Sequence, residues 1–180
     1  MADFNCHVRI FVTTDDNGNI IRSNDKTGHF ELQIDGLNGA SLNFDGHTFN
    51  KPVFSYGGAG VTMYNGSLVP YNNCRYYSFD FTAPSDKVYD FIMNKMRDTY
   101  LDTGNETVYS NRVVYRVKTG PFQQYNINST NCFTAVAAWC SWLGYNTLSN
   151  IVANSDSYTD YIAWRMYDRY GGAWTYHGQY

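Results

Sequence analysis

Alternation of apolar and polar residues in the first half of the chain is the feature that most restricts its fold. Cys6–Thr13 is a β-branched and aromatic run that alternates along its length. His29–Ile34 alternates as well, with Phe30, Leu32 and Ile34 on one face and polar residues on the other. Because successive side chains of a strand point to opposite faces, both segments predict strands with one buried face.

Turn residues separate these strands from their predicted neighbours. Asp15–Asn19 is typical of a turn and Ile20–Ile21 resumes after it, so a hairpin is the simplest prediction. Gly36–Gly39 predicts another turn, and Ala40–Phe44 is the expected partner of the His29–Ile34 strand. The other non-helical segments are a long loop or irregular strands over Lys51–Asn73 and strands over Tyr76–Phe81 and Thr107–Lys118.

Helical segments follow the first strands. Pro84–Tyr100 carries an apolar stripe at helical spacing and opens with proline, which suits the first turn of a helix. Cys132–Leu143 is apolar, follows polar capping residues and ends before Gly144, a common residue at helix ends. A break at Gly120-Pro121 precedes this helix, and a further helix is expected over Tyr158–Tyr170. Strands followed by helices predict an α+β fold.

Length and charge limit the class of function. A chain of 180 residues has the size of one domain, and we predict a single domain over residues 1–180. Lys and Arg number 13 against 16 Asp and Glu, for a net charge of -3 without any basic run, which argues against nucleic-acid binding. The start lacks the pattern of a Sec signal peptide, and no apolar run reaches membrane-spanning length, so neither a signal peptide nor a membrane span is expected.

The cysteines and glycines predict no metal and no cofactor. Cys6, Cys74, Cys132 and Cys140 lack zinc-ligand spacing, although their even number leaves a disulfide open, with Cys6 and Cys74 as one candidate pair. Gly57–Gly60 lacks the Lys-Ser/Thr ending of a phosphate-binding loop.

Cys132 is the clearest candidate for a reactive group. It lies at the predicted start of a helix, where free backbone N–H groups and the helix dipole stabilise a thiolate. Catalysis would also need an imidazole to hold and return the proton. His29 is the first candidate, on the polar face of its strand; His7 lies on another strand, His47 in an expected turn and His177 in an expected mobile tail. The alternative is that Cys132 is a small buried residue and His29 a structural one.

Two segments resemble one branch of the papain-like hydrolases. Thr27–Leu32 resembles the "GH-aromatic-x-L" strand of circularly permuted NlpC-type enzymes. Tyr125–Phe133 resembles the "Y-x-L-x-x-N-N-C-x-x-F" helix start of that branch, and Leu143–Tyr145 its "L-G" helix end. The His strand precedes the Cys helix, as in permuted members. The sequence departs from the pattern in having one Asn directly before the Cys and Phe at residue 30, where a small residue is frequent.

The resemblance implies an α+β papain-like fold in permuted order, with an antiparallel sheet packed on the Cys132 helix. It also implies a Cys132 thiolate, a His29 imidazole and a third polar group on the next strand that orients the ring. The matching strand, Ala40–Phe44, makes Asn43 the first choice for that group and His47 the second. Glu31 is a poorer choice, because a residue two along the same strand usually points parallel to the ring.

The same resemblance implies a site for the oxyanion formed during acyl transfer. The backbone N–H of Cys132 would hold it together with a polar neighbour, for which Asn131 and Tyr125 are the candidates. No metal or cofactor takes part.

The expected reaction is hydrolysis of an amide bond through a thioester, and the family suggests peptidoglycan stem peptides as substrate. The protein would then be an antibacterial effector, a toxin made in the cytoplasm and delivered to a target-cell periplasm by a type VI-like secretion apparatus. A cognate immunity protein would be its partner in the producing cell.

Two alternatives stay open. The same dyad could serve a lipid acyltransferase or esterase, or a deconjugating peptidase, since permuted relatives include these. Aromatic residues make up 18% of the chain and charged residues only 16%, so a carbohydrate- or wall-binding module is also consistent. The Tyr56–Tyr77 and Trp174–Tyr180 regions would then stack on sugars.

Overall fold

One antiparallel sheet forms the centre of the fold in the computed structural model, which describes residues 2–118 and 124–180. Its strand order is β10-β7-β1-β2-β5-β6-β9-β8. The strands are β1 (Asp3–Thr13), β2 (His29–Ile34), β5 (Pro52–Gly57), β6 (Gly60–Asn65), β7 (Cys74–Pro84), β8 (Thr107–Val108), β9 (Val113–Tyr115) and β10 (Thr175–Gln179). The sheet and the helices described below confirm the mixed α+β class.

The two strands with the clearest alternation form the middle of this sheet. β1 pairs with β2 on one side and with β7 on the other, and Phe11 of β1 lies opposite His29 of β2. The apolar residues Phe30, Leu32 and Ile34 are buried together in the main core, as the alternation predicts. Glu31 and Gln33 face the opposite side of the sheet and are buried as well, so the prediction of a single buried face is wrong for β2.

The partner predicted for the His29 strand is wrong. Leu42–Phe44 forms β3, which pairs with β4 (His47–Phe49) in a separate two-stranded sheet, whereas β2 pairs with β1 and β5. The turn between β3 and β4 explains this pairing. Asp45 and Gly46 both have positive φ, 52° and 81°, as the tightest hairpin turns require, so the segment folds onto the residues directly after it.

The Lys51–Asn73 segment contains regular strands that the sequence pattern hides. β5 and β6 form a hairpin, and Val53, Phe54, Ser55 and Tyr56 are all buried. Because both faces of β5 are covered, its residues do not alternate in polarity. 

Three smaller strand predictions also need correction. Ile20 makes one isolated bridge to Thr14 rather than a hairpin strand. Thr107–Lys118 holds two short paired strands, β8 and β9, and not one long strand. The tail predicted to be mobile forms β10, which pairs with β7 through His177's neighbours Tyr176 and Gly178.

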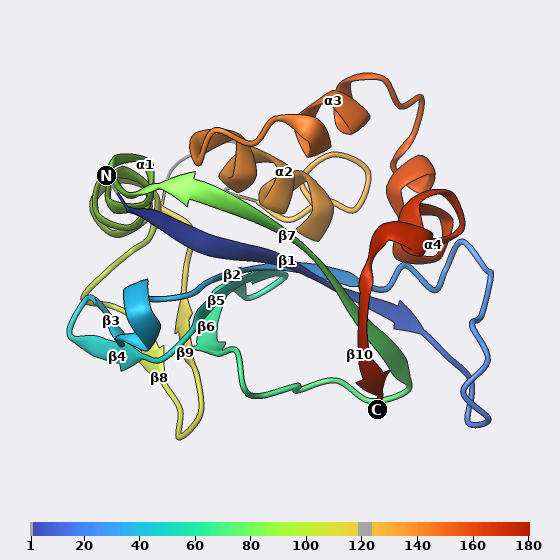
Figure 1. Cartoon of the computed structure of the whole chain (residues 1–180), viewed down its shortest axis with the longest axis horizontal. Coiled ribbons are helices and arrows are strands. Elements are labelled where there is room, and N and C mark those ends of the chain that lie inside the picture. Colours follow the sequence, from blue (N-terminus) through green and yellow to red (C-terminus); the bar gives the residue numbers. More distant parts are fainter. Residues whose placement is uncertain (1, 119–123) are drawn as a thin grey trace.

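The helices α2, α3 and α4 lie together on one face of the sheet (Figure 1). The helical segments are α1 (Ser85–Tyr89), the π-helix η2 (Asp90–Tyr100), α2 (Cys132–Trp142), α3 (Thr147–Ala153), α4 (Ala163–Tyr170) and the 3₁₀ turns η1 (Leu37–Gly39), η3 (Tyr158–Tyr161) and η4 (Gly171–Ala173). The predicted Pro84–Tyr100 helix is thus α1 continued by η2, and α3 was not predicted. Extended backbone at Ile162 divides the predicted Tyr158–Tyr170 helix in two. Gly120-Pro121 lies outside the described residues.

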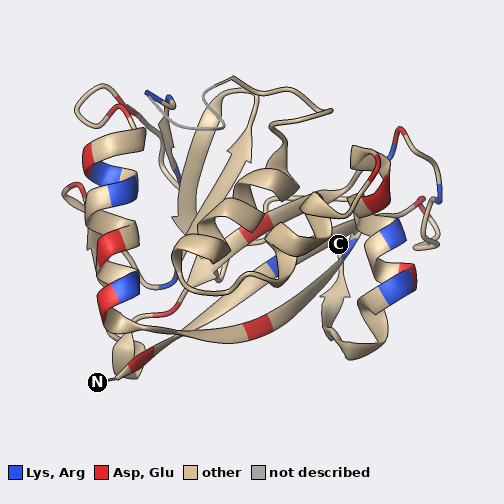
Figure 2. Ribbon diagram, turned by 90° about the horizontal axis from the view of Figure 1, so that it is seen from above, with Lys and Arg blue, Asp and Glu red and all other residues tan. Residues whose placement is uncertain are grey.

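Aromatic packing fixes α2 on the sheet. Phe133 meets Phe30 edge to face at 4.8 Å between ring centroids, and Trp139 meets Phe54 at 6.2 Å. Lys, Arg, Asp and Glu are absent from α2 and α3 and gather instead on the helices at the two ends of the molecule (Figure 2). Among the described residues, no helix has the length and apolar character needed to cross a membrane.

The four cysteines are free thiols. Cys6 pairs with Phe81 and Cys74 with Thr13 in the β1–β7 ladder, which places the two thiols at opposite ends of it. At about 3.3 Å per residue the separation is roughly 20 Å, far beyond the reach of a disulfide. The Cys6–Cys74 pair is therefore not formed.

Candidate functional site

Cys132 is the first residue of α2, and a reciprocal cap fixes this helix start. The Asn131 side chain accepts a hydrogen bond from the Thr134 N–H at 3.0 Å, and the Thr134 hydroxyl accepts one from the Asn131 N–H at 2.8 Å. The amide nitrogen of Asn131 donates to the Ile127 carbonyl at 2.8 Å. The Asn131 side chain thus caps the start of α2, and its expected role as an oxyanion donor stays a prediction.

His29 is the first residue of β2, and its approach depends on Gly28. The φ of Gly28 is +69°, and a Cβ there would lie 2.4 Å from the Phe11 carbonyl oxygen and 2.5 Å from the Ala163 Cβ. Only glycine fits this close contact at positive φ. Close packing against Phe11 and Ala163 thus explains why a glycine precedes His29.

The fold brings Cys132 and His29 together. Their side chains are hydrogen-bonded, and the Phe30 N–H donates to the Cys132 sulfur. β2 pairs with β5 only at Leu32 and Gln33. The residues of β2 before Leu32 are therefore open to the start of α2. The start of α2 and the start of β2 therefore lie next to each other at the Cys132 thiol.

Glu31 is the acidic partner of the imidazole. His29 Nε2 lies 3.2 Å from Glu31 Oε1 and 2.7 Å from the Ser55 hydroxyl, which leaves Nδ1 for Cys132. The Glu31 side chain is fully buried, and the hydroxyls of Tyr64 and Tyr71 donate to it. Glu31, which strand geometry had made the poorer choice, is therefore the residue beside the His29 ring.

The charges of this site support one another. Burial alone would raise the pKa of Cys132, but the charge and hydrogen bond of His29 hold it below its ordinary value. Burial lowers the pKa of His29, but the Cys132 thiolate and the Glu31 carboxylate outweigh it and raise the value to about 10. The favoured state is a thiolate beside an imidazolium.

Arg9 completes the buried network. Its Nε lies 3.6 Å from Glu31 Oε2, and both side chains are fully buried. Burial alone would raise the pKa of Glu31, but hydrogen bonding to His29 and the charges of His29 and Arg9 hold it below its usual range. Arg9 also donates to the backbone carbonyls of Gly66 and Leu68. Two positive and two negative groups therefore share one buried site.

Asn43 and His47, the expected third members, do not reach His29. Asn43 accepts a hydrogen bond from Gly46 within the β3–β4 turn. His47 Nε2 lies 3.2 Å from a carboxylate oxygen of Glu106. Both lie on the separate hairpin, because β5 and not β3 is the strand beside β2.

Tyr125 does lie near the thiol. Its pKa is raised by burial and by the charge of Cys132, and its ring packs 5.4 Å from that of Tyr56. A small pocket beside Cys132 is lined by Tyr125, Ile127 and Tyr158 among others, with no charged residue among the described lining residues. Cys132 itself is one of the residues that line this pocket.

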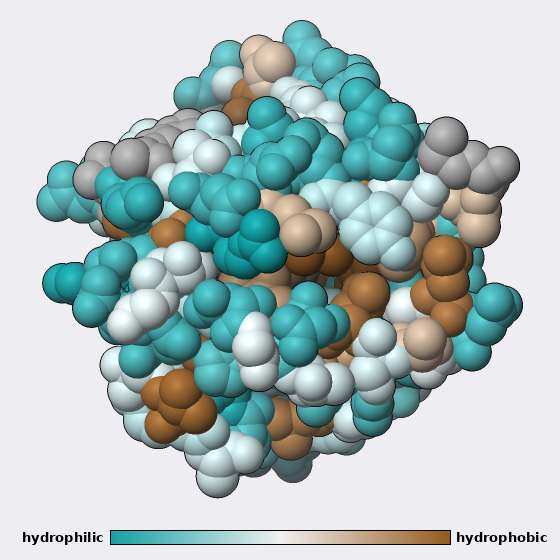
Figure 3. Space-filling view, turned by 90° about the vertical axis from the view of Figure 1, so that its left-hand side faces the viewer, coloured by the Kyte–Doolittle hydropathy of each residue, from teal (hydrophilic) through white to brown (hydrophobic). Residues whose placement is uncertain are grey.

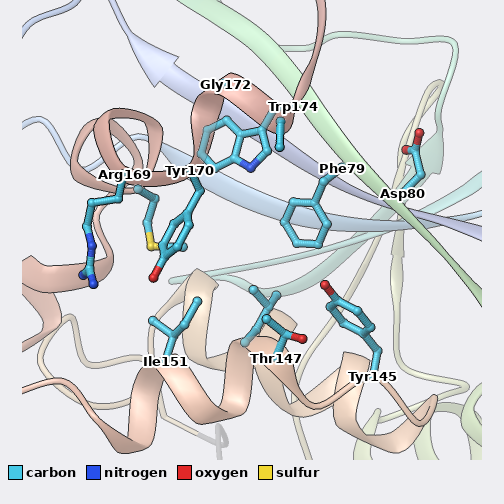
Figure 4. A pocket seen from close by; sticks show the side chains of 12 residues that line it. Phe79, Asp80, Tyr145, Thr147, Ile151, Arg169, Tyr170, Gly172 and Trp174 are labelled. Carbon is cyan, nitrogen blue, oxygen red and sulfur yellow. The ribbon is translucent and has the colours of Figure 1, made fainter.

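A cavity of about 500 Å³, separate from the thiol, lies between β7, α3 and α4. Tyr145, Tyr170 and Trp174 surround it, and Arg169 and Asp80 stand at its sides (Figure 4). Trp174 belongs to the tail proposed as a sugar-binding surface. Of the five tyrosines in the other proposed region, those at 56, 64, 76 and 77 are instead buried in the fold, and Tyr71 is partly buried.

Arg9, Ser55, Tyr64 and Tyr71 were not singled out from the sequence. Of these four residues, only Arg9 could have been noticed in the sequence, because it is a charged residue within the apolar run of β1. The hydroxyl residues come from distant segments and became neighbours only through the sheet order.

No known protein family, curated protein or solved structure matches the chain.

Proposed function

We propose that the protein is a cysteine hydrolase of permuted papain-like, NlpC-type architecture, with Cys132 as nucleophile, His29 as general acid and base, and Glu31 as positioning residue. The observation that carries this proposal is the Cys132–His29 hydrogen bond beside the buried Glu31 carboxylate. A nucleophile, a base and a group that orients the base are the recurring parts of such sites.

The first half of the reaction would form a thioester. The Cys132 thiolate attacks the carbonyl carbon of an amide, and the electron pair of the C=O moves to oxygen. When the tetrahedral intermediate collapses, the C–N bond breaks and the His29 imidazolium gives its proton to the leaving amine. The products of this half are the acyl-enzyme, the free amine and a neutral imidazole.

Water then completes the reaction. Neutral His29 takes a proton from water as the hydroxide attacks the thioester carbonyl, and the C–S bond breaks. A carboxylic acid leaves and the thiolate–imidazolium pair returns. The first backbone N–H groups of α2, at Cys132 and Phe133, have no carbonyl partner within the helix and would stabilise the oxyanion, with the nearby Tyr125 hydroxyl as a second donor.

Peptidoglycan stem peptides are the proposed substrate class, and a delivered antibacterial effector with an immunity partner is the proposed setting. The uncharged aromatic and aliphatic pocket beside Cys132 suits an uncharged group next to the scissile amide. A lipid ester or an isopeptide would use the same dyad and remains the alternative substrate.

Alkylation mapping tests the dyad. We would treat the folded protein with iodoacetamide from about pH 5 to 9 and follow each cysteine by mass spectrometry. We expect Cys132 to react fast well below the ordinary thiol pKa, and His29→Ala to abolish this advantage. The buried Cys140 is an internal control that should stay unmodified. Slow Cys132 labelling, or no effect of His29→Ala, would contradict the dyad.

Substrate class needs a separate assay. Purified peptidoglycan, a lipid ester and an isopeptide-linked conjugate would each be incubated with wild type and Cys132→Ala, and products identified by mass spectrometry. New amine termini in stem peptides, absent with Cys132→Ala, would support the proposal. If products form only from the lipid ester or the conjugate, the result would instead support the alternative substrate.

A second candidate function is glycan binding in the cavity between β7, α3 and α4. The exposed ring of Tyr170 and the partly buried ring of Trp174, together with Arg169 and Asp80, offer both stacking and hydrogen bonds to hydroxyls. Trp174→Ala should then weaken binding of soluble peptidoglycan glycan fragments in titration calorimetry, whereas Cys132→Ala should not. Equal binding by wild type and Trp174→Ala would contradict this function.

A further inference from the structure

A second cluster of ionisable groups lies outside the Cys132 site, on the β3–β4 hairpin. It consists of Asp45 in the hairpin turn, His47 at the start of β4 and Glu106 directly before β8. One ligand atom from each residue lies within 4.8 Å of the other two. Among residues 2–118 and 124–180 this is the one group of three or more His, Cys, Asp or Glu side chains that converges in this way.

The spacing of these atoms suits one small cation. Nε2 of His47 lies 3.2 Å from Oε1 of Glu106. Two ligands of a tetrahedral zinc ion, at bond lengths of about 2.0–2.1 Å, lie roughly 3.3 Å apart. The second Glu106 oxygen accepts the Gly104 N–H at 2.7 Å, which leaves Oε1 directed at His47.

The two carboxylates face each other. Carboxylate oxygens of Asp45 and Glu106 lie within 4.8 Å of each other, where two ionised carboxylates repel. Water screens this repulsion only partly, because the His47 and Glu106 side chains are 26% and 14% exposed. A divalent cation would compensate both charges at once.

The His7 site shows that residue composition alone does not make such a cluster. His7 also touches two carboxylates, but Asp80 bonds to Nδ1 at 2.6 Å and Asp35 to Nε2 at 2.7 Å. These nitrogens point away from each other across the ring, so no single ion can bind all three residues. His7 is therefore a matched control for His47.

We propose that Asp45, His47 and Glu106 bind one first-row divalent cation, with zinc as the best match. One imidazole nitrogen and two carboxylate oxygens are ligands that zinc accepts, and water would fill the remaining position. The site joins two segments that are far apart in sequence. One is the β3–β4 hairpin outside the main sheet, and the other is the residue directly before β8, an edge strand of that sheet. Its role would be to fasten the hairpin to the sheet edge, independently of the proposed hydrolase function.

The surface on this side of the molecule is mostly hydrophilic (Figure 3). The His47 and Glu106 side chains are both partly exposed, so a cation can reach them from solvent. The cysteine spacing had predicted no metal site, and this cluster contains no cysteine. 

Zinc binding to the full chain tests the proposal. The protein would be stripped with a chelator, and zinc chloride titrated in by calorimetry in the Cys132→Ala background, which removes the accessible thiol as a competing ligand. We expect one zinc ion per chain, at least tenfold weaker binding for His47→Ala and for Glu106→Gln, and unchanged binding for His7→Ala. Cobalt should give the weak visible bands of nitrogen and oxygen ligands without a thiolate charge-transfer band.

The Asp45→Asn variant separates loss of a zinc ligand from loss of folding. Asparagine tolerates the positive φ of the turn but lacks the charge, so the variant should keep the far-UV circular dichroism of the wild type and still lose affinity. Zinc binding that survives His47→Ala, weakens equally in His7→Ala or does not occur at micromolar zinc would overturn the proposal.

Discussion

The imidazole of His29 bonds to Glu31, two residues further along the same strand, at 3.2 Å between Nε2 and Oε1. Residues at this spacing share one face of a strand, so their side chains start out parallel. Glu31 nevertheless reaches the ring, and Tyr64, Tyr71 and Arg9 hold its carboxylate in place. One short strand segment therefore supplies both the proposed base and the group that orients it.

Glu31→Gln should slow alkylation of Cys132 at pH 7 by up to about tenfold, the loss of thiolate that a rise of about one unit in the Cys132 pKa gives. The substitution removes a charge that keeps His29 protonated. Reaction rates with iodoacetamide, measured on samples with native circular dichroism, check this. 

Two variants control for folding and for loss of charge elsewhere. Ser55→Ala removes the other Nε2 contact of His29 and should have a smaller effect. Glu106→Gln makes the same chemical change directly before β8, outside the Cys132 site, and should have no effect. A Glu31→Gln protein that labels as fast as wild type would show that the carboxylate does not act on the dyad.

The pH dependence of the two reactions should differ. Alkylation needs only the thiolate, whose pKa lies below the ordinary 9.0, so its rate should rise early with pH and then stay level. Amide hydrolysis also needs the imidazolium, which is lost as pH rises through the His29 pKa of about 10. Hydrolysis should therefore fall above that pH while alkylation does not. 

Glu31→Gln should move the fall in hydrolysis to lower pH, because Glu31 is one of the charges that raise the His29 pKa. Rates measured between about pH 5 and 11 across both reactions would check this. Parallel profiles for hydrolysis and alkylation would contradict the role of His29 as an acid.

Arg9→Met should lower the free energy of unfolding by about 3–5 kcal/mol, since it leaves Glu31 buried without its cation. The double variant Arg9→Met, Glu31→Gln should recover part of this loss, because no uncompensated carboxylate remains. Urea unfolding of the single and double variants measures both values. Strictly additive losses would indicate that the two charges do not interact.

Asn131→Ala should lower the free energy of unfolding by about 1 kcal/mol through loss of the helix cap. Asn131→Asp keeps an oxygen acceptor for the Thr134 N–H but loses the amide donor, so it should restore most of the stability. Hydrolysis by Asn131→Asp should stay within a fewfold of wild type. A large drop in its rate with intact stability would instead support the oxyanion role expected from the resemblance.

The sequence by itself determined the local elements near the proposed dyad. Alternation at His29–Ile34 fixed that strand and its buried face, since one side of it meets the core. The polar residues before Cys132 and the glycine after Leu143 fixed both ends of α2, because capping depends on neighbouring residues. Cys132 and His29 could thus be named from short-range patterns.

Only the tertiary structure decided what surrounds them. The order of strands made Ser55 of β5 the neighbour of His29, whereas the sequence had put Asn43 there. Strand order depends on pairings between distant segments, and the fully buried β5 shows no alternation that would reveal it. The same long-range pairing joined Arg9 to Glu31 and gathered the hairpin cluster at His47, contacts that no local pattern encodes.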